Sequence, residues 1–476
     1  MGITPIKFGT DGWRGVIAQD FTFDNVQLCA QGVANYHLKN GLAGKKIVVG
    51  FDTRFASSEF AVAVAEVLAG NGFPVLLMDK NSPTPVLSSN IVANEAAGGV
   101  MITASHNPKQ WNGFKYRTYY GGSPSASVIE GIESNIPTAQ EMSFVRNLSY
   151  ERASDSGLIK LIDPDIFYLD RVKSLIDLER LRRINKIVVV DAMHGAGGGY
   201  FSKILGINNE NISELRSEIN PAFPGMRNPE PVEHNLRWLS KVVGDSEAIM
   251  GLALDGDADR LGVIKEDGKY ITSLEVFALL IYYLLEVRGL RGPIIKSISV
   301  GRMAARLAKQ YGVPVHETGV GFKYIAPVMM QEDGLVGGEE SGGYAFRGHL
   351  PERDGVVSGL FLIDLLVSTG QTLSNLIEEL YKKIGPHYYE RIDLTFPASR
   401  RDEIQLRVAS TNPQRLGGLL VHSIDTMDGI RFNLDEDAWV MVRFSGTEPL
   451  LRIYSEADNE RQVLGLLNAA REITGI

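Results

Sequence analysis

Four short segments carry the side chains of this sequence that could do chemistry. They are Thr103–Pro108 (TASHNP), Asp255–Arg260 (DGDADR), Gly338–Gly343 (GEESGG) and Arg443–Pro449 (RFSGTEP). The first offers a serine hydroxyl, Ser105, that could carry a phosphoryl group. The second offers three carboxylates at alternating positions, and hard divalent cations prefer such oxygen ligands. Together these two segments indicate phosphoryl transfer assisted by a divalent cation.

Ser105 follows a predicted strand at 99–103 and precedes a histidine, an asparagine and a proline that cannot continue regular structure. We therefore expect the serine on an exposed turn at the carboxyl end of a strand, where open α/β sheets place their sites. An ordinary polar turn is the alternative, because Ser, Asn and Pro are common turn residues. The Gly-x-Ser-x-Gly pattern of many serine hydrolases is absent.

Asp255, Asp257 and Asp259 lie between two apolar, strand-like segments. Alternate side chains of an extended chain point the same way, so the three carboxylates converge. Without a cation they would raise one another's pKa, and a bound Mg²⁺ removes that cost. An EF-hand loop is one alternative because Glu266 falls at its twelfth position, but Arg260 stands where that loop needs glycine. A solvated acidic turn is the other alternative.

The remaining motifs could hold a phosphate and a sugar. Segment 443–449 combines an arginine, two hydroxyls and a glycine that frees backbone N–H groups, which suits a phosphate clamp. Glu339 and Ser341 lie on a glycine-flanked loop suited to adjacent sugar hydroxyls. Lys115 could act as a base if a nearby cation lowered its pKa. The plainer alternatives are bare turns and a solvated lysine.

Two glycine runs, 194–199 and 319–323, raise the possibility of a dinucleotide site. The first follows a predicted strand, but it lacks a clean Gly-x-Gly-x-x-Gly pattern. We therefore discount a dinucleotide cofactor.

Short apolar strands alternate with helical segments through most of the chain, which predicts α/β units with helices on both sheet faces. The last part changes to alternating strands followed by one helix, which predicts a small α+β unit. The expected strands are 46–50, 74–78, 99–103, 186–191, 293–300, 439–443 and 451–455, and the expected helices include 57–68 and 461–473.

The chain exceeds what one hydrophobic core supports, because it has 476 residues. A polar stretch at 133–156, a hairpin turn at 267–268 and Gly385-Pro386 mark the boundaries. The predicted units are 1–145 with the serine segment, 157–266 with the aspartates, 267–384 with the Glu-Glu-Ser loop, and 385–476 with the Arg443 loop.

The composition is that of a soluble globular protein, with 44% hydrophobic and 22% charged residues. A net charge of −9 argues against a nucleic-acid or anionic-membrane partner. Cys29 is the only cysteine, so no intrachain disulfide forms. No signal-peptide pattern opens the sequence, and its longest apolar run is too short to span a bilayer. We therefore expect a cytoplasmic protein.

The four segments, in this order, resemble those of the α-D-phosphohexomutase superfamily, above all phosphoglucomutases and phosphomannomutases. The resemblance extends from Phe8–Gly15 (FGTDGWRG) to the loop at Arg443. It implies four domains around a central cleft: three mixed α/β domains and a C-terminal α+β domain like the TATA-binding protein. It also implies an enzyme that interconverts hexose 1-phosphate and hexose 6-phosphate through a phosphoserine and a hexose 1,6-bisphosphate.

The resemblance assigns roles to particular residues. Ser105 is the expected phosphoserine and Lys115 the expected general base. The implied catalytic residues are Ser105, Lys115, Arg14 and His106, and the implied Mg²⁺ ligands are Asp255, Asp257 and Asp259 together with the phosphate on Ser105. The implied substrate-binding residues are Glu339, Ser341, Arg443, Ser445, Gly446, Thr447, Arg260, Lys323 and Arg353.

One position departs from the family pattern. Some members carry a histidine after the Glu-x-Ser-Gly motif, and Gly343 stands there in this sequence. Others carry a lysine in a following segment, and Arg353 takes its place. Arginine keeps its proton, so the second acid–base residue is left open between Arg353 and His349.

The Glu-Glu-Ser form of the sugar loop favours glucose as the substrate, with mannose as the second candidate. Mg²⁺ is the expected cofactor, and glucose 1,6-bisphosphate is the expected activator and intermediate. The expected partner is a small phosphosugar, not a nucleic acid or a membrane, and the protein is expected to be a monomer or homodimer. Two alternatives stay open: a phosphotransferase that releases the bisphosphate, and a non-catalytic phosphosugar-binding protein.

Overall fold

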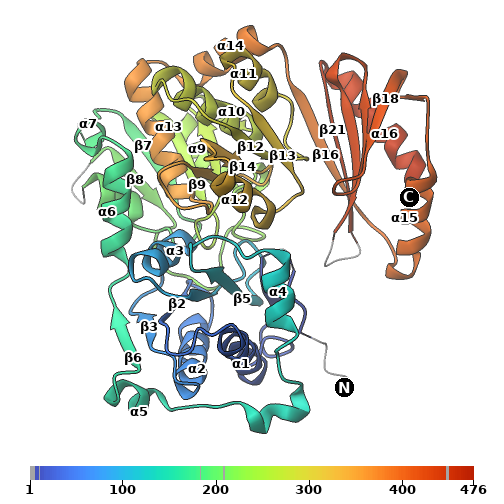
Figure 1. Cartoon of the computed structure of the whole chain (residues 1–476). Helices are drawn as coiled ribbons and strands as arrows, with labels where there is room; N and C mark the ends of the chain where they lie inside the picture. Colours follow the sequence, from blue (N-terminus) through green and yellow to red (C-terminus); the bar gives the residue numbers. More distant parts are fainter. Residues whose placement is uncertain (1–5, 10, 183, 207–209, 446–449) are drawn as a thin grey trace.

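Four β-sheets follow one another along the chain (Figure 1). The computed structural model describes residues 6–9, 11–182, 184–206, 210–445 and 450–476. The first three sheets mix parallel and antiparallel strands and are packed with helices, whereas the fourth is antiparallel throughout. The predicted fold class, three α/β units and a final α+β unit, is confirmed.

The first sheet has the strand order β1-β5-β4-β2-β3-β6, with a parallel centre and antiparallel β5 and β1. Val48 and Val49 point to opposite faces of β2, where Val48 packs in the core with α3 and Val49 packs with α1 and α2. The elements are β1 (Trp13–Val16), α1 (Phe23–Lys39), β2 (Ile47–Phe51), α2 (Ser57–Gly70), β3 (Val75–Met78), α3 (Thr84–Ala93), β4 (Gly98–Ile102), β5 (Trp111–Thr118), α4 (Ala126–Glu133), α5 (Tyr150–Asp155) and β6 (Ile159–Ile162).

The second sheet has the order β11-β10-β9-β7-β8, and its β9–β10 hairpin presents the aspartate segment in the connection. The elements are α6 (Asp165–Leu175), α7 (Leu178–Arg182), β7 (Ile187–Asp191), α8 (Tyr200–Leu205), β8 (Ile212–Leu215), α9 (Arg237–Gly244), β9 (Ala248–Leu254), β10 (Leu261–Lys265) and β11 (Tyr270–Ile271).

The third sheet has the order β13-β12-β14-β15, and the Glu-Glu-Ser loop connects β14 to β15. The elements are α10 (Ser273–Tyr282), β12 (Ile294–Ser297), α11 (Met303–Tyr311), β13 (Val315–Thr318), α12 (Phe322–Gln331), β14 (Val336–Gly338), β15 (Tyr344–Phe346), α13 (Gly355–Thr369) and α14 (Leu373–Ile384).

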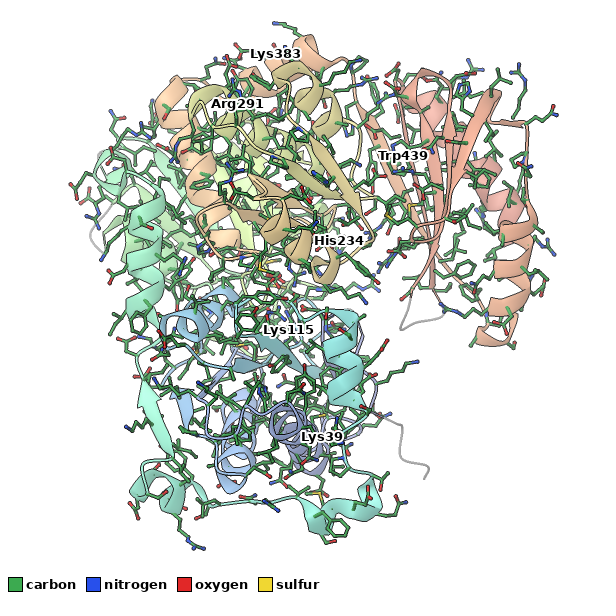
Figure 2. All side chains as sticks on the ribbon, viewed as in Figure 1. Lys39, Lys115, His234, Arg291, Lys383 and Trp439 are labelled. Atoms are coloured by element: carbon green, nitrogen blue, oxygen red, sulfur yellow. The ribbon has the colours of Figure 1, made fainter. Side chains whose placement is uncertain are left out.

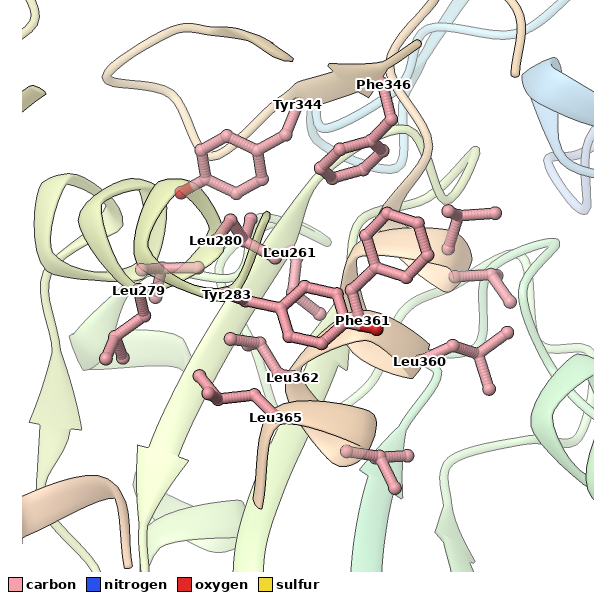
Figure 3. Packing of buried hydrophobic residues seen from close by; sticks show 14 of the residues in the cluster. Leu261, Leu279, Leu280, Tyr283, Tyr344, Phe346, Leu360, Phe361, Leu362 and Leu365 are labelled. Carbon is pink, nitrogen blue, oxygen red and sulfur yellow. The ribbon is translucent and has the colours of Figure 1, made fainter. Parts of the chain in front are cut away.

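Helix α13 joins the second and third units into one core (Figure 3). It is buried over most of its length and contacts β9 and β10 of the second sheet as well as β15 and α10. The ring of Phe361 packs at 4.7 Å from that of Phe346 and at 5.4 Å from that of Tyr283. This shared core fixes the Glu-Glu-Ser loop relative to the aspartate segment.

The fourth unit has its own core, with α15 and α16 packed against the antiparallel sheet. A small cluster that includes Ile298 and Trp439 connects it to the third unit (Figures 1 and 2). The elements are β16 (Tyr388–Thr395), α15 (Arg401–Ser410), β17 (Arg415–Leu416), β18 (Leu419–Asp425), β19 (Ile430–Leu434), β20 (Trp439–Phe444), β21 (Leu450–Ala457) and α16 (Glu460–Thr474).

Two strands lie outside the unit in which the sequence analysis put them. β6 pairs with β3 of the first sheet although the predicted second unit begins at residue 157. β11 pairs with β10 of the second sheet although the predicted third unit begins at residue 267. Both follow a turn or helix that the sequence pattern treats as a boundary.

Within the described ranges, no helix taken alone has the length and apolarity needed to cross a membrane. Only α13 and α14 together meet that test of length and composition, and they are bent by 86° at their junction.

Candidate active site

Ser105 lies in the loop between β4 and β5, at the carboxyl end of β4, as predicted. Its backbone is left-handed, with a φ of 50°, which is uncommon for a residue other than glycine. The prediction of an exposed turn is wrong, because only 1% of the residue's surface is exposed. The side chain of Arg54 and the aspartate segment of the second unit cover the turn.

The aspartate segment reaches the serine directly. The Ser105 hydroxyl donates a hydrogen bond of 2.7 Å to Oδ2 of Asp255. The other oxygen of Asp255 accepts the backbone N–H groups of Asp259 and Arg260, which fixes the carboxylate. A β-carbon at Gly256 would lie 2.3 Å from the Ser105 carbonyl oxygen, so only glycine allows this approach of the two loops.

The three predicted aspartates are brought together and fully buried. One oxygen from each of Asp255, Asp257 and Asp259 lies within 4.8 Å of the others. Burial, and then the charges of Asp259 and Asp257, raise the pKa of Asp255 well above its usual value. Oδ1 of Asp257 and Oδ1 of Asp259 are buried without a hydrogen-bond donor from the described residues. Such a cluster of hard, partly unsatisfied oxygens fits a divalent cation.

Lys115 comes from β5 and lies between the first and second units (Figure 2). Its amine is 2.7 Å from Asp257, 3.0 Å from Asp11 and 3.3 Å from Asp259. Burial alone would lower the pKa of this amine, but the three carboxylates outweigh burial and raise it. In this arrangement Lys115 is a cation that partly neutralises the aspartate cluster.

Arg353 connects all three α/β units. Its Nη2 is 2.7 Å from Asp259 of the second unit and 2.9 Å from Asp11 of the first. Its Nη1 is 3.6 Å from Glu339 on the sugar loop. Glu352 makes a second link of this kind, because Arg117 of the first unit lies 2.5 Å from it. The predicted sugar loop is thereby held beside the aspartates.

His349 lies apart from this network. Its Nε2 is 2.8 Å from Asp354, the residue that caps α13, and its ring faces Tyr168 of α6. The described contacts of His349 are with these helix residues rather than with Ser105. The structure therefore brings Arg353, and not His349, to the site.

The sugar loop places Glu339 inward. Burial raises the pKa of Glu339 to about 7, although nearby Arg353 opposes the shift. Ser341 is half-buried in the turn, and Gly342 has a left-handed φ of 86° with its carbonyl oxygen bonded to the N–H of Leu261. The loop is thus anchored to the strand that follows the aspartate segment.

Arg443 is the next-to-last residue of β20 in the fourth unit, with its Nε 3.1 Å from Asp428. Asp428 also accepts the N–H of Val320, at the second glycine run of the third unit. Ser445 is buried, whereas the predicted residues Gly446 and Thr447 lie outside the described residues. Lys323 is half-buried at the start of α12 and packs over the ring of Tyr324.

Three further predicted residues surround the serine loop. Arg14 donates a hydrogen bond of 2.5 Å to Asn107. His106 Nδ1 lies 3.2 Å from the Ser105 hydroxyl, and burial together with Arg260 and other cations lowers the histidine pKa well below its usual value. Arg260 lies 3.7 Å from Glu230 and 3.9 Å from Asp259.

Sequence reasoning did not identify four residues that hold the site: Arg54, Thr84, Asp11 and Glu352. The hydroxyl of Thr84 donates a hydrogen bond of 2.5 Å to Asp257. Arg54 belongs to an Asp-Thr-Arg triplet directly after β2. Because β2 and β4 are parallel neighbours, the residues that follow them lie at the same edge of the sheet. The position of the triplet after a predicted strand could therefore have indicated that Arg54 lies near Ser105.

The first glycine run, residues 194–199, packs against the aspartate segment. A β-carbon at Gly195 would lie 2.8 Å from the Gly256 carbonyl oxygen, and the N–H of Ala196 donates to that same oxygen. The run therefore supports the aspartate segment.

Family models match almost the whole chain. The models described as phosphoglucomutase/phosphomannomutase alpha/beta/alpha domains I, II and III match residues 5–143, 167–268 and 273–384. The model of the C-terminal domain of the same family matches residues 403–473.

Individual proteins match over nearly their full length. A phosphoglucomutase/phosphomannomutase of Thermococcus kodakarensis is 30% identical over 455 residues, which cover 96% of this chain and 95% of that protein. A relative from Methanopyrus kandleri, assigned as a phosphoglucosamine mutase, is 30% identical, with 96% and 94% covered. A solved structure from Thermus thermophilus, assigned as a phosphomannomutase, is 34% identical with a TM-score of 0.86, and 100% of each chain is covered.

Proposed function

Because the chain belongs to the phosphoglucomutase/phosphomannomutase family of phosphoryl-transferring mutases, we propose that it interconverts hexose 1-phosphate and hexose 6-phosphate. We propose glucose as the preferred sugar and mannose as the second. The observation that carries the proposal is the hydrogen bond of 2.7 Å between the Ser105 hydroxyl and Asp255, at the edge of a buried cluster of three aspartates. A nucleophilic hydroxyl beside a cation site is what a phosphoserine enzyme requires.

Asp255, Asp257 and Asp259 are our proposed ligands for Mg²⁺. Their buried oxygens converge within 4.8 Å, and the unsatisfied Oδ1 atoms of Asp257 and Asp259 support this assignment. When bound there, Mg²⁺ supplies positive charge beside the phosphoryl group on Ser105. Lys115 and Arg353 hold two of the three carboxylates in place from outside the cluster.

The first transfer moves the phosphoryl group from Ser105 to the free hydroxyl of the bound hexose 1-phosphate. The Oγ–P bond breaks and a P–O bond forms to the sugar oxygen. The sugar hydroxyl loses its proton to a basic group, and Ser105 Oγ takes up a proton as it leaves. We propose Lys115 for that group. It accepts the proton as the neutral amine, a form that a cation on the aspartates would favour by offsetting the carboxylates that raise the pKa of Lys115. Arg14 and His106 lie beside the serine loop. The product is the hexose 1,6-bisphosphate.

The second transfer returns a phosphoryl group to the enzyme. After the bisphosphate has turned over in the site, Ser105 takes the phosphoryl group from the other position of the sugar. Ser105 Oγ gives up its proton to the basic group as it attacks, and the sugar oxygen that leaves takes up a proton. Hexose 6-phosphate is thereby formed and the phosphoserine is regenerated. The same bisphosphate, supplied from outside, would phosphorylate the serine and activate the enzyme.

The remaining proposed residues hold the substrate. Glu339 and Ser341 would contact adjacent sugar hydroxyls, because their loop is anchored beside the aspartate segment. Arg260 and Arg353 supply positive charge beside Glu339, and Lys323 is a further proposed substrate-binding residue. Arg443, Ser445, Gly446 and Thr447 would bind the phosphate that is not transferred.

The same reasoning suggests where and how the enzyme acts. We propose a cytoplasmic protein that acts as a monomer or homodimer on a small phosphosugar. The single cysteine fits the cytoplasmic location, and the net charge of −9 fits a partner other than a nucleic acid.

A coupled assay of glucose 6-phosphate formation from glucose 1-phosphate tests the proposed function. The assay contains Mg²⁺ and catalytic glucose 1,6-bisphosphate, with Ser105→Ala in parallel and mannose 1-phosphate as a competing substrate. We expect turnover in the wild type and none in the variant, and the ratio of the two sugars gives the preference. No turnover of any hexose 1-phosphate by folded, Ser105-phosphorylated protein would refute the mutase proposal.

A further inference from the structure

One side chain, Arg54, holds the whole serine loop. Its Nη2 donates hydrogen bonds of 2.6 Å to the carbonyl oxygens of Ser105 and Asn107. Its Nη1 donates hydrogen bonds of 3.0 Å to the carbonyl oxygens of Pro108 and Trp111. One guanidinium therefore binds four main-chain acceptors across seven residues, from Ser105 to Trp111, the first residue of β5.

The guanidinium is itself fixed from three sides. Its Nε lies 3.3 Å from Asp52, and the other oxygen of Asp52 accepts the hydroxyl of Ser57 at 2.8 Å. Ser57 in turn accepts the side-chain amide of Asn112 at the start of β5. From the second unit, the ring of Phe223 covers the guanidinium, with its centroid 5.1 Å from Cζ. Arg54 is 3% exposed, so water does not compete for these bonds.

The geometry of the loop needs such a cation. Four carbonyl dipoles that point to one place repel one another unless a donor with several N–H groups sits between them. Ser105 also holds a left-handed backbone conformation, which persists only where the surroundings fix it. The same carbonyl of Ser105 that Arg54 binds is the one against which Gly256 packs.

We propose that Arg54 is a positioning residue for phosphoryl transfer: by binding the four carbonyls it sets the backbone of Ser105 and directs Oγ to Asp255. Arg54 does not touch the transferred group in this role. The proposal rests on the proposed function, because it assumes that Ser105 Oγ is the atom that carries the phosphoryl group. Arg54 lies outside the four sequence motifs, so the proposal makes activity depend on a residue that those motifs do not include.

Arg54→Lys is the decisive variant. Lysine keeps the positive charge beside Asp52, but its compact ammonium cannot place a planar fork of donors among four carbonyls. We expect kcat to fall about 100-fold, the scale of effect that a displacement of about 1 Å at a reacting group produces. The KM for the hexose phosphate should change by less than about 3-fold, because the sugar and distal-phosphate residues lie in other units.

Arg216→Lys is the matched control. Arg216 also forms a buried pair with an aspartate, Asp191, and its guanidinium also lies over an aromatic ring, that of Trp238. Its side chain does not contact the serine loop. We expect this variant to lose stability comparable to that lost by Arg54→Lys while it keeps kcat within about 2-fold of the wild type.

Hydrogen exchange on residues 103–111 gives a readout that needs no activity. In Arg54→Lys, amides of this segment should exchange about 10-fold faster than in the wild type, while those of β2 and β4 stay protected. In Arg216→Lys the segment should exchange as in the wild type. If Arg54→Lys does not fold, Phe223→Leu takes its place in the test. Phe223→Leu removes the ring over the guanidinium, so kcat should fall and the amides of 103–111 should exchange faster, both by less than in Arg54→Lys.

The outcomes separate the two proposals. A selective loss of kcat together with faster exchange in 103–111 supports the positioning role. Wild-type kcat and exchange in Arg54→Lys would overturn it, and so would losses of kcat, KM and stability that match those of Arg216→Lys. An inactive wild type would overturn the proposed function, and the exchange result would still decide the positioning role of Arg54.

Discussion

The side chain of Arg353 occupies the volume that a side chain at position 343 would need. A β-carbon at Gly343 would lie 2.3 Å from Cδ of Arg353 and 2.8 Å from its Cγ. Arg353 cannot give way, because its guanidinium is bound to Asp11 and Asp259. A side chain at 343 and an arginine at 353 are therefore alternatives. This relationship accounts for the glycine where the family resemblance led us to look for a histidine.

Gly343→Ala should therefore cost about 1–3 kcal/mol of unfolding free energy, the usual range for overpacking a dense interior. It should also lower activity, because the displaced Arg353 releases Glu339 and Asp259. Denaturant unfolding and the mutase assay measure the two effects.

Arg353→Ala provides the control through a double-mutant cycle. In that background the β-carbon at 343 has room, so adding Gly343→Ala should cost much less than it does in the wild type. Additive costs in the cycle would show that the two positions do not compete for space.

Thr84→Val tests the support of the cation site from α3. The Thr84 hydroxyl donates to Asp257, and its backbone N–H donates to the carbonyl of the same residue. Loss of a bond that orients a metal ligand typically weakens metal binding by about 10–100-fold. The concentration of Mg²⁺ that half-activates the enzyme should rise by that factor, as titration of the assay with Mg²⁺ would measure.

Ser88→Ala is the matched control on the same helix. The Ser88 hydroxyl is also fully buried, but it has no hydrogen-bond partner among the described residues. Its removal should leave the Mg²⁺ dependence unchanged. An equal shift in both variants would assign the effect to the packing of α3 rather than to Asp257.

The site could be predicted from the sequence where its chemistry is local. Ser105 and the three aspartates each lie in short segments whose spacing places them at strand ends, and the structure brings them together. The repeated strand pattern likewise predicted three α/β units, because buried strands read as short apolar runs.

The rest could not be predicted because it depends on contacts between distant segments. Thr84 meets Asp257 across 173 positions of the sequence. Ser105 is buried because Arg54 and the aspartate segment of the second unit both cover it. His349 lies in a segment that resembles a family motif, so the sequence made it a candidate acid–base residue. In the structure it instead contacts Asp354, which caps α13. Motif spacing carries no information on such pairings.

His37 predicts a pH dependence of stability outside the site. Burial lowers the pKa of His37 to about 4, and its Nε2 lies 3.0 Å from the hydroxyl of Tyr116. The unfolded chain takes up this proton near pH 6.5, whereas the folded protein does so only near pH 4. The stabilising contribution is therefore complete above pH 6.5 and declines as the pH falls toward 4, by up to about 3 kcal/mol.

His37→Gln should flatten that part of the stability profile. Denaturant unfolding at several values between pH 7 and about pH 4, with wild type and variant compared at each, isolates the contribution from those of other groups. The exposed residue His234 provides the control, because His234→Gln should reproduce the wild-type slope (Figure 2). Parallel profiles for wild type and His37→Gln would contradict the assignment.

Mg²⁺ should stabilise the folded protein through the aspartate cluster, because a ligand that binds only the folded state adds free energy by mass action. At 100 times its Kd the expected gain is about 2.7 kcal/mol. Asp257→Asn should lose most of this gain, since it removes one of the three converging carboxylate charges from the cluster. Asp245→Asn, at an exposed ion pair with Lys241, should retain it. Thermal unfolding with and without Mg²⁺ measures the difference, and equal shifts in the two variants would place the cation elsewhere.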